Sequence, residues 1–187
     1  AAAPEVVAIG ECGLDHNRDF SPRPVQETWF KRQVELAIEL KLPLFLHERD
    51  AAGAFLAVLD GLAPPPERVV VHCFTGDAPT LRQYVKRGFY VGITGWICDE
   101  RRGQHLRALV REIPRDRLLV ETDAPFLAPR DVKPRIERNE PRHLRQGLAP
   151  HRRLVADVPP QPARAVVLAH PLLQDGLRRA AKVQLRV

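Results

Sequence analysis

Five short apolar runs, separated by longer segments with helical periodicity, constrain the fold of this chain more than any other feature. The runs are 6–10, 43–47, 68–72, 89–94 and 118–123. They are apolar without strict alternation, which is typical of strands buried on both faces of a parallel sheet. Strands of this kind that alternate with helices predict an α/β fold, and both a doubly wound sheet and a TIM barrel satisfy the pattern.

The length of the chain separates these two folds. A complete (β/α)8 TIM barrel has eight strands and typically about 250 residues. This chain has 187 residues, contains no methionine and reaches its first apolar run within a few residues of Ala1. We therefore predict an incomplete TIM barrel whose N-terminal strands are missing from the sequence.

The segments between the apolar runs are predicted to be helices. Residues 24–40 carry a broad apolar stripe at helical spacing, which we expect to face the core. The stripe consists of Val25, Trp29, Leu36 and Leu40, with Phe30, Val34 and Ile38 alongside. Asp50 is expected to cap a helix over 51–62, and a third helix is expected to begin at Pro79 and end at Gly88. A further helix is predicted over 102–112.

Composition divides the chain into two regions. Residues 1–145 contain the predicted strands and form a partial barrel domain, whereas residues 146–187 are a tail rich in Pro, Arg, Ala and Leu. We expect this tail to be poorly ordered or loosely docked, with an amphipathic helix over 172–187 as the alternative. The tail carries six Arg and one Lys against two Asp, which is +5 of the total charge of +6. The basic character of the chain therefore says little about the predicted domain.

Cysteine content and hydropathy indicate the compartment. The three cysteines form no Cys-x-x-Cys pair, which indicates reduced thiols rather than a disulfide framework. No apolar window approaches the roughly 18 residues that a membrane helix needs, and no signal peptide opens the chain. We expect a cytoplasmic protein without membrane contact.

Four of the five predicted strands end in a side chain that can bind a metal ion: Glu11, His47, His72 and Asp123. The carboxyl ends of parallel strands open on one face, so these side chains are predicted to converge. A carboxylate with two imidazoles suits Zn²⁺ or Mn²⁺, and shared carboxylates suit a two-metal hydrolase. Each residue alone has an ordinary alternative as a hydrogen-bonding, ion-pairing or turn residue. We favour the joint interpretation because chance would scatter them over both ends of the sheet.

Six sequence blocks in order support this interpretation. They are GECGLD at 10–15, LFLHERDA at 44–51, VVHCFTG at 70–76, VGITGWICDERRG at 91–103, LLVETDAPFLAPRD at 118–131 and RNEP at 138–141. Over about residues 4–145 the chain closely resembles the TatD-type deoxyribonucleases, metal-dependent TIM-barrel hydrolases of the amidohydrolase superfamily. Nothing after Leu144 resembles them, which we interpret as a shifted reading frame.

The resemblance implies roles for the four strand-end residues. Glu11 would bridge two divalent metal ions, His47 and His72 would complete one site, and Asp123 would ligate the other ion and activate the attacking water. The implied cofactors are two Mg²⁺ ions, with Mn²⁺ or Zn²⁺ as alternatives, and the implied activity is exonuclease cleavage of single-stranded DNA or RNA. The His-x-His motif that completes the second site in the family does not occur in this sequence.

Loops on the same predicted face supply further candidates. Arg49, Arg101 and Arg102 are candidate phosphate contacts, and Asp15 and Glu121 are candidate supports for the metal ligands, as are Asp99 and Glu100. Three aromatic residues beyond strand ends could stack on bases, although ordinary packing is the simpler explanation for each: Phe74, Trp96 and Phe126. Cys12 and Cys73 flank ligand positions, but neither is needed as a ligand.

Two other functions fit the same pattern. Related hydrolases of the superfamily act on esters, lactones or amides with a similar metal site. A chain that lacks the His-x-His motif is also consistent with a non-catalytic, truncated remnant that binds one metal ion. The oligomeric state is not predicted.

Overall fold

A computed structural model of the chain describes residues 6–128, 130, 134, 137–143 and 165–167. The chain divides into two compact units. The first unit comprises residues 1–92 and 112–118, and the second comprises residues 93–111 and 119–187.

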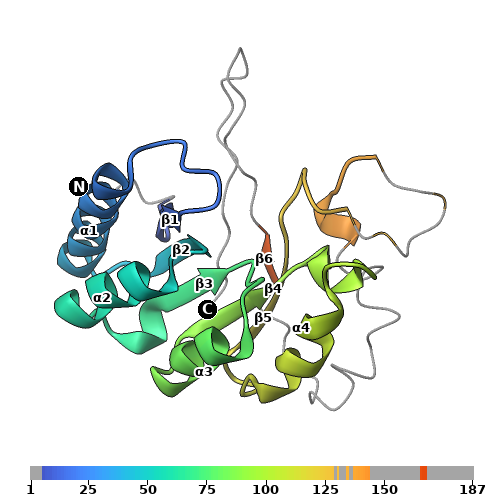
Figure 1. Ribbon diagram of the computed structural model, residues 1–187. Helices are drawn as coiled ribbons and strands as arrows, with labels where there is room; N and C mark the ends of the chain where they lie inside the picture. The colour runs from blue at the N-terminus through green and yellow to red at the C-terminus, as the bar shows by residue number, and fades with distance from the viewer. Residues whose placement is uncertain (1–5, 129, 131–133, 135–136, 144–164, 168–187) are drawn as a thin grey trace. The chain divides into compact units, whose positions relative to one another are not determined.

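The first unit is built from parallel strands that alternate with helices (Figure 1). Its strands are β1 (Ile9–Asp15), β2 (Leu44–Arg49), β3 (Val69–His72) and β4 (Tyr90–Ile93), and they pair in sequence order. The helices are α1 (Arg23–Leu40), α2 (Ala52–Leu62) and α3 (Ala78–Lys86), with the short 3-10 helix η1 (Pro66–Arg68) before β3. Sequential parallel pairing with a helix between strands confirms the predicted α/β class.

The core of the first unit lies between the strands and these helices. Three aromatic rings from successive helices pack in a row: Phe30 stacks on Phe55 at 5.1 Å between ring centroids, and Phe55 meets Tyr84 edge to face at 5.9 Å. All three side chains are almost fully buried, and the middle strands β2 and β3 also contain buried Leu and Val residues. Burial of large apolar surface on one side of the sheet holds the helices against it.

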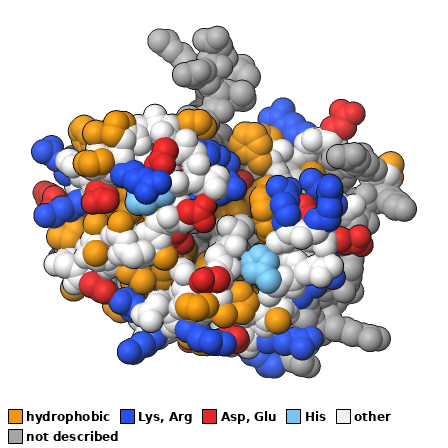
Figure 2. Space-filling view, viewed as in Figure 1, with side chains coloured by type: hydrophobic (Ala, Val, Ile, Leu, Met, Phe, Trp, Pro, Cys, Tyr) orange, Lys and Arg blue, Asp and Glu red, His pale blue; other side chains and the backbone are white. Residues whose placement is uncertain are grey.

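Helix α1 buries only part of the apolar stripe that the sequence predicts. Its buried residues are Phe30, Val34 and Ala37. The exposed apolar residues, between 38% and 58% accessible, are Val25, Trp29, Leu36, Ile38 and Leu40. The helix carries two apolar faces, and periodicity alone does not tell which of them packs on the core. Figure 2 shows the resulting mixture of hydrophobic and charged side chains on the surface over α1.

The other helix boundaries follow the prediction except at Asp50. Asp77 caps α3, because its side chain accepts the backbone N–H of Thr80, and Gly88 (φ +75°) follows the end of that helix. Asp50 does not cap α2, whose N-cap is Ala51 without a side-chain bond. Instead the backbone N–H of Ala51 donates to Glu48.

The second unit contains a smaller set of elements. The 3-10 helix η2 (Gly95–Cys98) precedes α4 (Gln104–Leu109), which continues as η3 (Val110–Glu112), whose last residue belongs to the first unit. Strand β5 (Leu118–Thr122) pairs in parallel with β6 (Ala165–Val167), and η4 (Pro141–His143) lies between them in sequence. Three residues of the tail are therefore a strand, while the predicted helix over 172–187 lies outside the described residues. Among the described helices, none has the length and hydrophobicity that crossing a membrane requires.

Candidate metal centre

Glu11 lies at an irregularity in β1. Gly10 pairs with Phe45 of β2, and Cys12 pairs with the next residue of β2, Leu46. Glu11 is therefore an extra residue between two consecutive pairs of the register. Such a β-bulge inserts an extra residue and redirects its side chain, and bulges are frequent beside functional sites. The prediction that the first strand ends in Glu11 was wrong, because β1 runs from Ile9 to Asp15 and contains Glu11.

The imidazole of His47 lies between two carboxylates. Its Nδ1 is 3.2 Å from Oε1 of Glu11, and its Nε2 is 3.5 Å from Oδ2 of Asp15. The second separation allows electrostatic attraction but is not an aligned hydrogen bond, so Nε2 is a buried polar atom without a hydrogen bond among the described residues. His47 lies inside β2 rather than at its end, two residues before Arg49. Glu11 and His47, which the sequence predicts to converge, are nevertheless in contact.

His72 lies beside His47 in the sheet. It is the last residue of β3, as predicted, and its Cα is level with that of His47. Level residues on neighbouring parallel strands project to the same face, about 4.8 Å apart. The ring of His72 packs 4.9 Å from the ring of Phe45, which shares a face with His47, and the side chain is almost fully buried. The two predicted histidines are therefore neighbours.

The loop after β1 holds Asp15 in a fixed position. Oδ1 of Asp15 accepts the backbone N–H groups of Asn17 (3.0 Å) and Arg18 (2.8 Å). Burial raises the pKa of the Asp15 carboxyl, but these two N–H groups and the nearby His47 and Arg18 outweigh it and lower the pKa below its ordinary value. Asp15 is therefore an ionised carboxylate beside His47, and its role as a support of the metal ligands stays a prediction.

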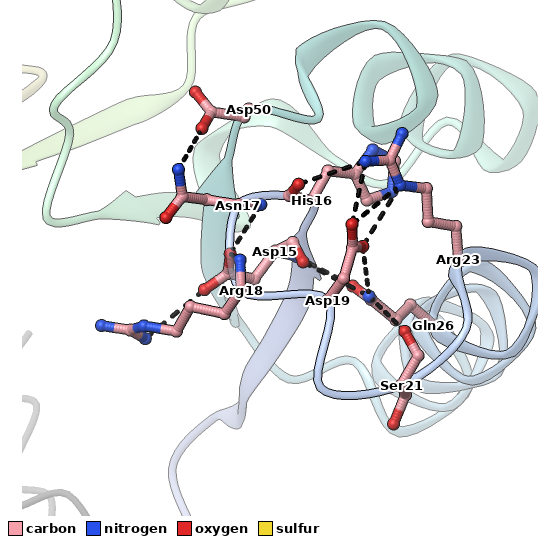
Figure 3. Close-up of polar contacts among 9 residues, drawn as sticks. All are labelled: Asp15, His16, Asn17, Arg18, Asp19, Ser21, Arg23, Gln26 and Asp50. Carbon is pink, nitrogen blue, oxygen red and sulfur yellow. Dashed lines mark hydrogen bonds and ion pairs between the residues drawn. The ribbon is translucent and has the colours of Figure 1, made fainter.

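Two side chains that the sequence analysis did not identify fix the same loop (Figure 3). Gln26 of α1 accepts the backbone N–H of Asp15 (2.9 Å) and donates to the carbonyl oxygens of Asp15 (3.3 Å) and Ser21 (2.8 Å). Asn17 donates to Oδ2 of Asp50 (2.8 Å), which ties this loop to the residue that follows β2. A glutamine on a helix surface carries no sequence signal for this role, so only the folded structure identifies it.

Glycine lets β1 approach β2 closely enough for the carboxylates to reach His47. Gly13 has φ +150°, and a Cβ built on it would overlap the carbonyl oxygen of His47 and lie 2.8 Å from the carbonyl carbon. No L side chain fits this position without displacement. The glycine of the GECGLD block therefore sets the spacing between the two strands at the candidate site.

The arrangement has the features of a divalent metal site. Glu11 and Asp15 carry two negative charges beside His47, and Arg18 offsets one of them at 3.4 Å from Asp15. A net negative group with a buried imidazole nitrogen attracts a cation. Metal-bound imidazoles commonly have a carboxylate against their second ring nitrogen, and His47 has a carboxylate at each nitrogen. Glu11, His47 and His72 fit as ligands, and Asp15 fits as a support.

The predicted site residues of the second unit lie on and after β5. Glu121 is almost fully buried within the strand, and the half-buried Asp123 follows it directly. The backbone N–H of Phe126 donates to the carbonyl of Asp123 at 2.6 Å, which forms a turn there. The assignment of Asp123 as a metal ligand and of Glu121 as a support stays a prediction.

The remaining candidates divide into packing and surface residues. Phe74 is buried edge to face against Tyr84, so its role is packing. Burial, assisted by the charge of Glu11, raises the pKa of the Cys12 thiol to about 12, which keeps it protonated. Arg49 ends β2 and is half-buried, level with Asp15. Its contact with substrate stays a prediction.

Comparison with known proteins gives consistent relatives. The family "TatD related DNase" matches residues 1–159, which extends past residue 145, where the predicted resemblance ended. The chain is 54% identical over 146 residues to the "3'-5' ssDNA/RNA exonuclease TatD" of Citrobacter rodentium, covering 77% of this chain and 56% of that protein. It is 58% identical over 143 residues to the protein of the same name from Cronobacter turicensis, covering 75% and 54%. The chain thus spans about half the length of these relatives.

Solved structures agree with the sequence relatives. YJJV, a TatD homologue from Escherichia coli, is 28% identical with a TM-score of 0.70, over 84% of this chain and 58% of that one. A TatD family hydrolase from Entamoeba histolytica is 26% identical with the same TM-score, over 80% and 56%. The predicted fold is confirmed in that the parallel α/β sheet covers part of the TIM-barrel-like fold of these neighbours. The match over residues 1–159, with these identities, shows that the chain belongs to the TatD-related DNase family.

Proposed function

We propose that this chain belongs to a divalent-metal-dependent hydrolase that cleaves phosphodiester bonds of single-stranded DNA or RNA as an exonuclease. Relatives more than 50% identical to it are named 3'-5' ssDNA/RNA exonucleases. The observation that carries the proposal is His47 between two carboxylates and beside His72 in the sheet. This is a set of side chains suited to a cation rather than to a neutral ligand.

Each residue has a role that follows from its chemistry. Glu11, His47 and His72 would hold one divalent ion, and Asp123 would be a ligand of a second, with Mg²⁺ the first choice and Mn²⁺ or Zn²⁺ as alternatives. Bound ions of this kind neutralise phosphodiester charge and lower the pKa of a water molecule toward about 7. With the ions bound, the carboxylate of Asp123 would accept the proton of the attacking water, and Asp15 would keep the His47 ring in one orientation.

Metal titration of the purified chain tests the ligand set. Isothermal titration with Mn²⁺ and Mg²⁺ is carried out on the unmodified chain and on His47→Ala, His72→Ala and His105→Ala. We expect His47→Ala and His72→Ala each to weaken binding at least tenfold, because removing a ligand typically has a large effect on affinity. His105 lies on α4 at the surface, so His105→Ala serves as the matched control. Unchanged affinity in both of the first two variants would contradict the ligand assignment.

A cleavage assay tests the substrate class. End-labelled single-stranded DNA and RNA and a panel of small esters, lactones and amides are incubated with the chain in the presence of Mg²⁺, Mn²⁺ or Zn²⁺. Stepwise shortening of the oligonucleotides that stops on addition of a chelator supports the nuclease. Metal-dependent turnover of an ester, lactone or amide without oligonucleotide cleavage would assign the alternative hydrolase. Metal binding without any turnover would assign the non-catalytic role.

A further inference from the structure

A cluster of arginines in the second unit surrounds one buried carboxylate. Asp99, directly after η2, is only 4% exposed. Its Oδ1 accepts the backbone N–H groups of Arg101 (3.0 Å) and Arg102 (3.1 Å), and its Oδ2 accepts Nε (3.1 Å) and Nη2 (3.0 Å) of Arg102. Nε of Arg130 lies 3.4 Å from the same Oδ2. One carboxylate therefore positions two guanidinium groups.

The loop that carries Asp99 is tightly built. The backbone N–H of Asp99 donates to the carbonyl of Trp96 (3.0 Å), and that of Gly103 donates to the carbonyl of Asp99 (2.8 Å). A Cβ built on Gly103 would overlap the Trp96 carbonyl and lie 3.0 Å from that of Asp99, so the turn closes around a glycine. Arg107 of α4 donates to the carbonyl of Ile97 at 3.3 Å. These bonds fix Asp99 before any ligand binds.

Trp96 fixes the orientation of one guanidinium. The central carbon of the Arg102 guanidinium lies 4.3 Å from the centroid of the Trp96 ring. Stacking on an aromatic face together with a two-nitrogen contact to a carboxylate holds the plane of this group. The side chains of Arg102 and Arg130 are nevertheless 54% and 46% exposed. Both guanidinium groups are thus positioned and accessible to solvent.

The cluster has more positive charge than the buried carboxylate requires. One guanidinium suffices to neutralise Asp99, so the second is in excess. With Arg101 and Glu100 included, three positive charges face two negative ones, which leaves a net charge of +1. Burial raises the pKa of Asp99, but the backbone N–H groups and the arginines outweigh it and lower the pKa to about 2, so Asp99 stays ionised. The bonds from Arg102 stabilise the buried Asp99, whereas the longer contact of Arg130 with the same oxygen adds little stability at the surface.

We propose that Arg102 and Arg130, positioned by Asp99 and Trp96, bind phosphodiester groups of a single-stranded nucleic acid. Guanidinium groups offer planar paired donors that match phosphate oxygens. The loops that carry these residues follow the carboxyl ends of β4 and β5, which is where α/β folds place ligand contacts. In this proposal Arg130 contacts phosphate, while Asp99 and Trp96 position the guanidinium groups. The identity of the ligand rests on the proposed nuclease function.

The test measures binding without catalysis. A fluorescein-labelled oligo(dT) of ten nucleotides is titrated with the full 187-residue chain in excess EDTA. The fluorescence anisotropy is recorded at several salt concentrations. Variants are Arg102→Gln, Arg130→Gln and the double variant, with Arg82→Gln as the control. Arg82 is exposed and pairs with Glu112 in the first unit, so its replacement removes the same charge elsewhere. Circular dichroism verifies that each variant is folded.

The salt dependence identifies phosphate contacts. Each contact with a single strand contributes about 0.7 to the slope of log affinity against log salt, so the double variant should lose about 1.4. We expect its affinity at low salt to fall at least tenfold, while Arg82→Gln keeps the slope of the unmodified chain. An unchanged slope in the folded double variant would overturn the proposal.

Two further arms separate the sources of the ligand chemistry. Inorganic phosphate at millimolar concentration should compete poorly, because a strand offers several phosphates, and equal competition would overturn the assignment to a strand. Binding of polyglutamate with the same dependence on Arg102 and Arg130 would overturn it as well. Because EDTA removes metal ions, the slope of log affinity against log salt reports the phosphate contacts of Arg102 and Arg130 independently of any metal. It remains informative even if the metal titration of His47→Ala contradicts the proposed nuclease.

Discussion

Replacing Gly13 with alanine is the perturbation that most directly tests how the candidate metal centre is built. The new Cβ would lie 2.8 Å from the carbonyl carbon of His47 and closer still to its oxygen, whereas ordinary contact begins near 3.4 Å. The strands must therefore separate by at least 3.4 − 2.8 = 0.6 Å at this point. The backbone at φ +150° adds strain for any residue with a Cβ.

The expected loss of stability combines these two effects. A strained backbone conformation costs about 1–3 kcal/mol, and insertion of an extra carbon into a packed position costs about 1–3 kcal/mol. Together they predict that Gly13→Ala lowers the free energy of unfolding by about 2–6 kcal/mol, a large part of the total of about 5–15 kcal/mol for a typical protein. Because β1 moves relative to β2, the affinity for Mn²⁺ should fall as well.

Urea unfolding followed by circular dichroism measures the first effect, and calorimetric titration measures the second. Gly61→Ala in α2 is the matched control, because nothing lies within 4 Å of the Cβ that it adds. Alanine in a helix is favoured over glycine, so this control should keep or increase stability by up to about 1 kcal/mol. A Gly13→Ala chain within about 0.5 kcal/mol of the unmodified one, the usual range for harmless surface changes, would refute the reasoning.

Three further predictions use other contacts. Tyr84→Phe removes the hydroxyl that donates to Glu48 at 2.8 Å and should cost about 1.5–3 kcal/mol in urea unfolding, as for other bonds to charged groups; no change would show that water replaces the bond. Phe55→Ala, at a fully buried ring, should cost about 3–5 kcal/mol, whereas Phe20→Ala, at a ring 88% exposed, should leave the midpoint unchanged. The lowered pKa of Asp99, about 2 against the ordinary 3.8, gives stability that is present above pH 3.8 and lost toward pH 2. The urea midpoint of Asp99→Asn should therefore fall less between these pH values than that of the unmodified chain, and equal falls would contradict the assignment.

The elements of the fold could be predicted because they depend on local periodicity. Buried strands that alternate with helices leave a clear pattern, and the end of β3 at His72 follows from the length of its apolar run. The bulge at Glu11 leaves no such pattern, since it arises from the register against β2. Likewise, the face of α1 that packs on the core depends on which of two apolar stripes meets the sheet.

The candidate site was predictable to the extent that its residue types are distinctive. Carboxylates and imidazoles at strand ends are uncommon enough to indicate a cation site, and His47 and His72 do lie side by side in register. Gln26 and Asn17 act through hydrogen bonds that span up to 11 and 33 residues of sequence, respectively. Contacts of this kind are set by tertiary packing, so composition and spacing contain no information about them.

Most of the candidate metal centre comes from one βαβ unit. Glu11, Asp15 and His47 lie on β1 and β2, and the helix between these strands supplies Gln26. Only about forty residues therefore have to become ordered before the acid and the imidazole meet, and loop closure over so short a distance has a low entropic cost. The placement of Glu11 and Asp15 against His47 should thus depend mainly on the stability of this local segment, while His72 of β3 completes the proposed ligand set.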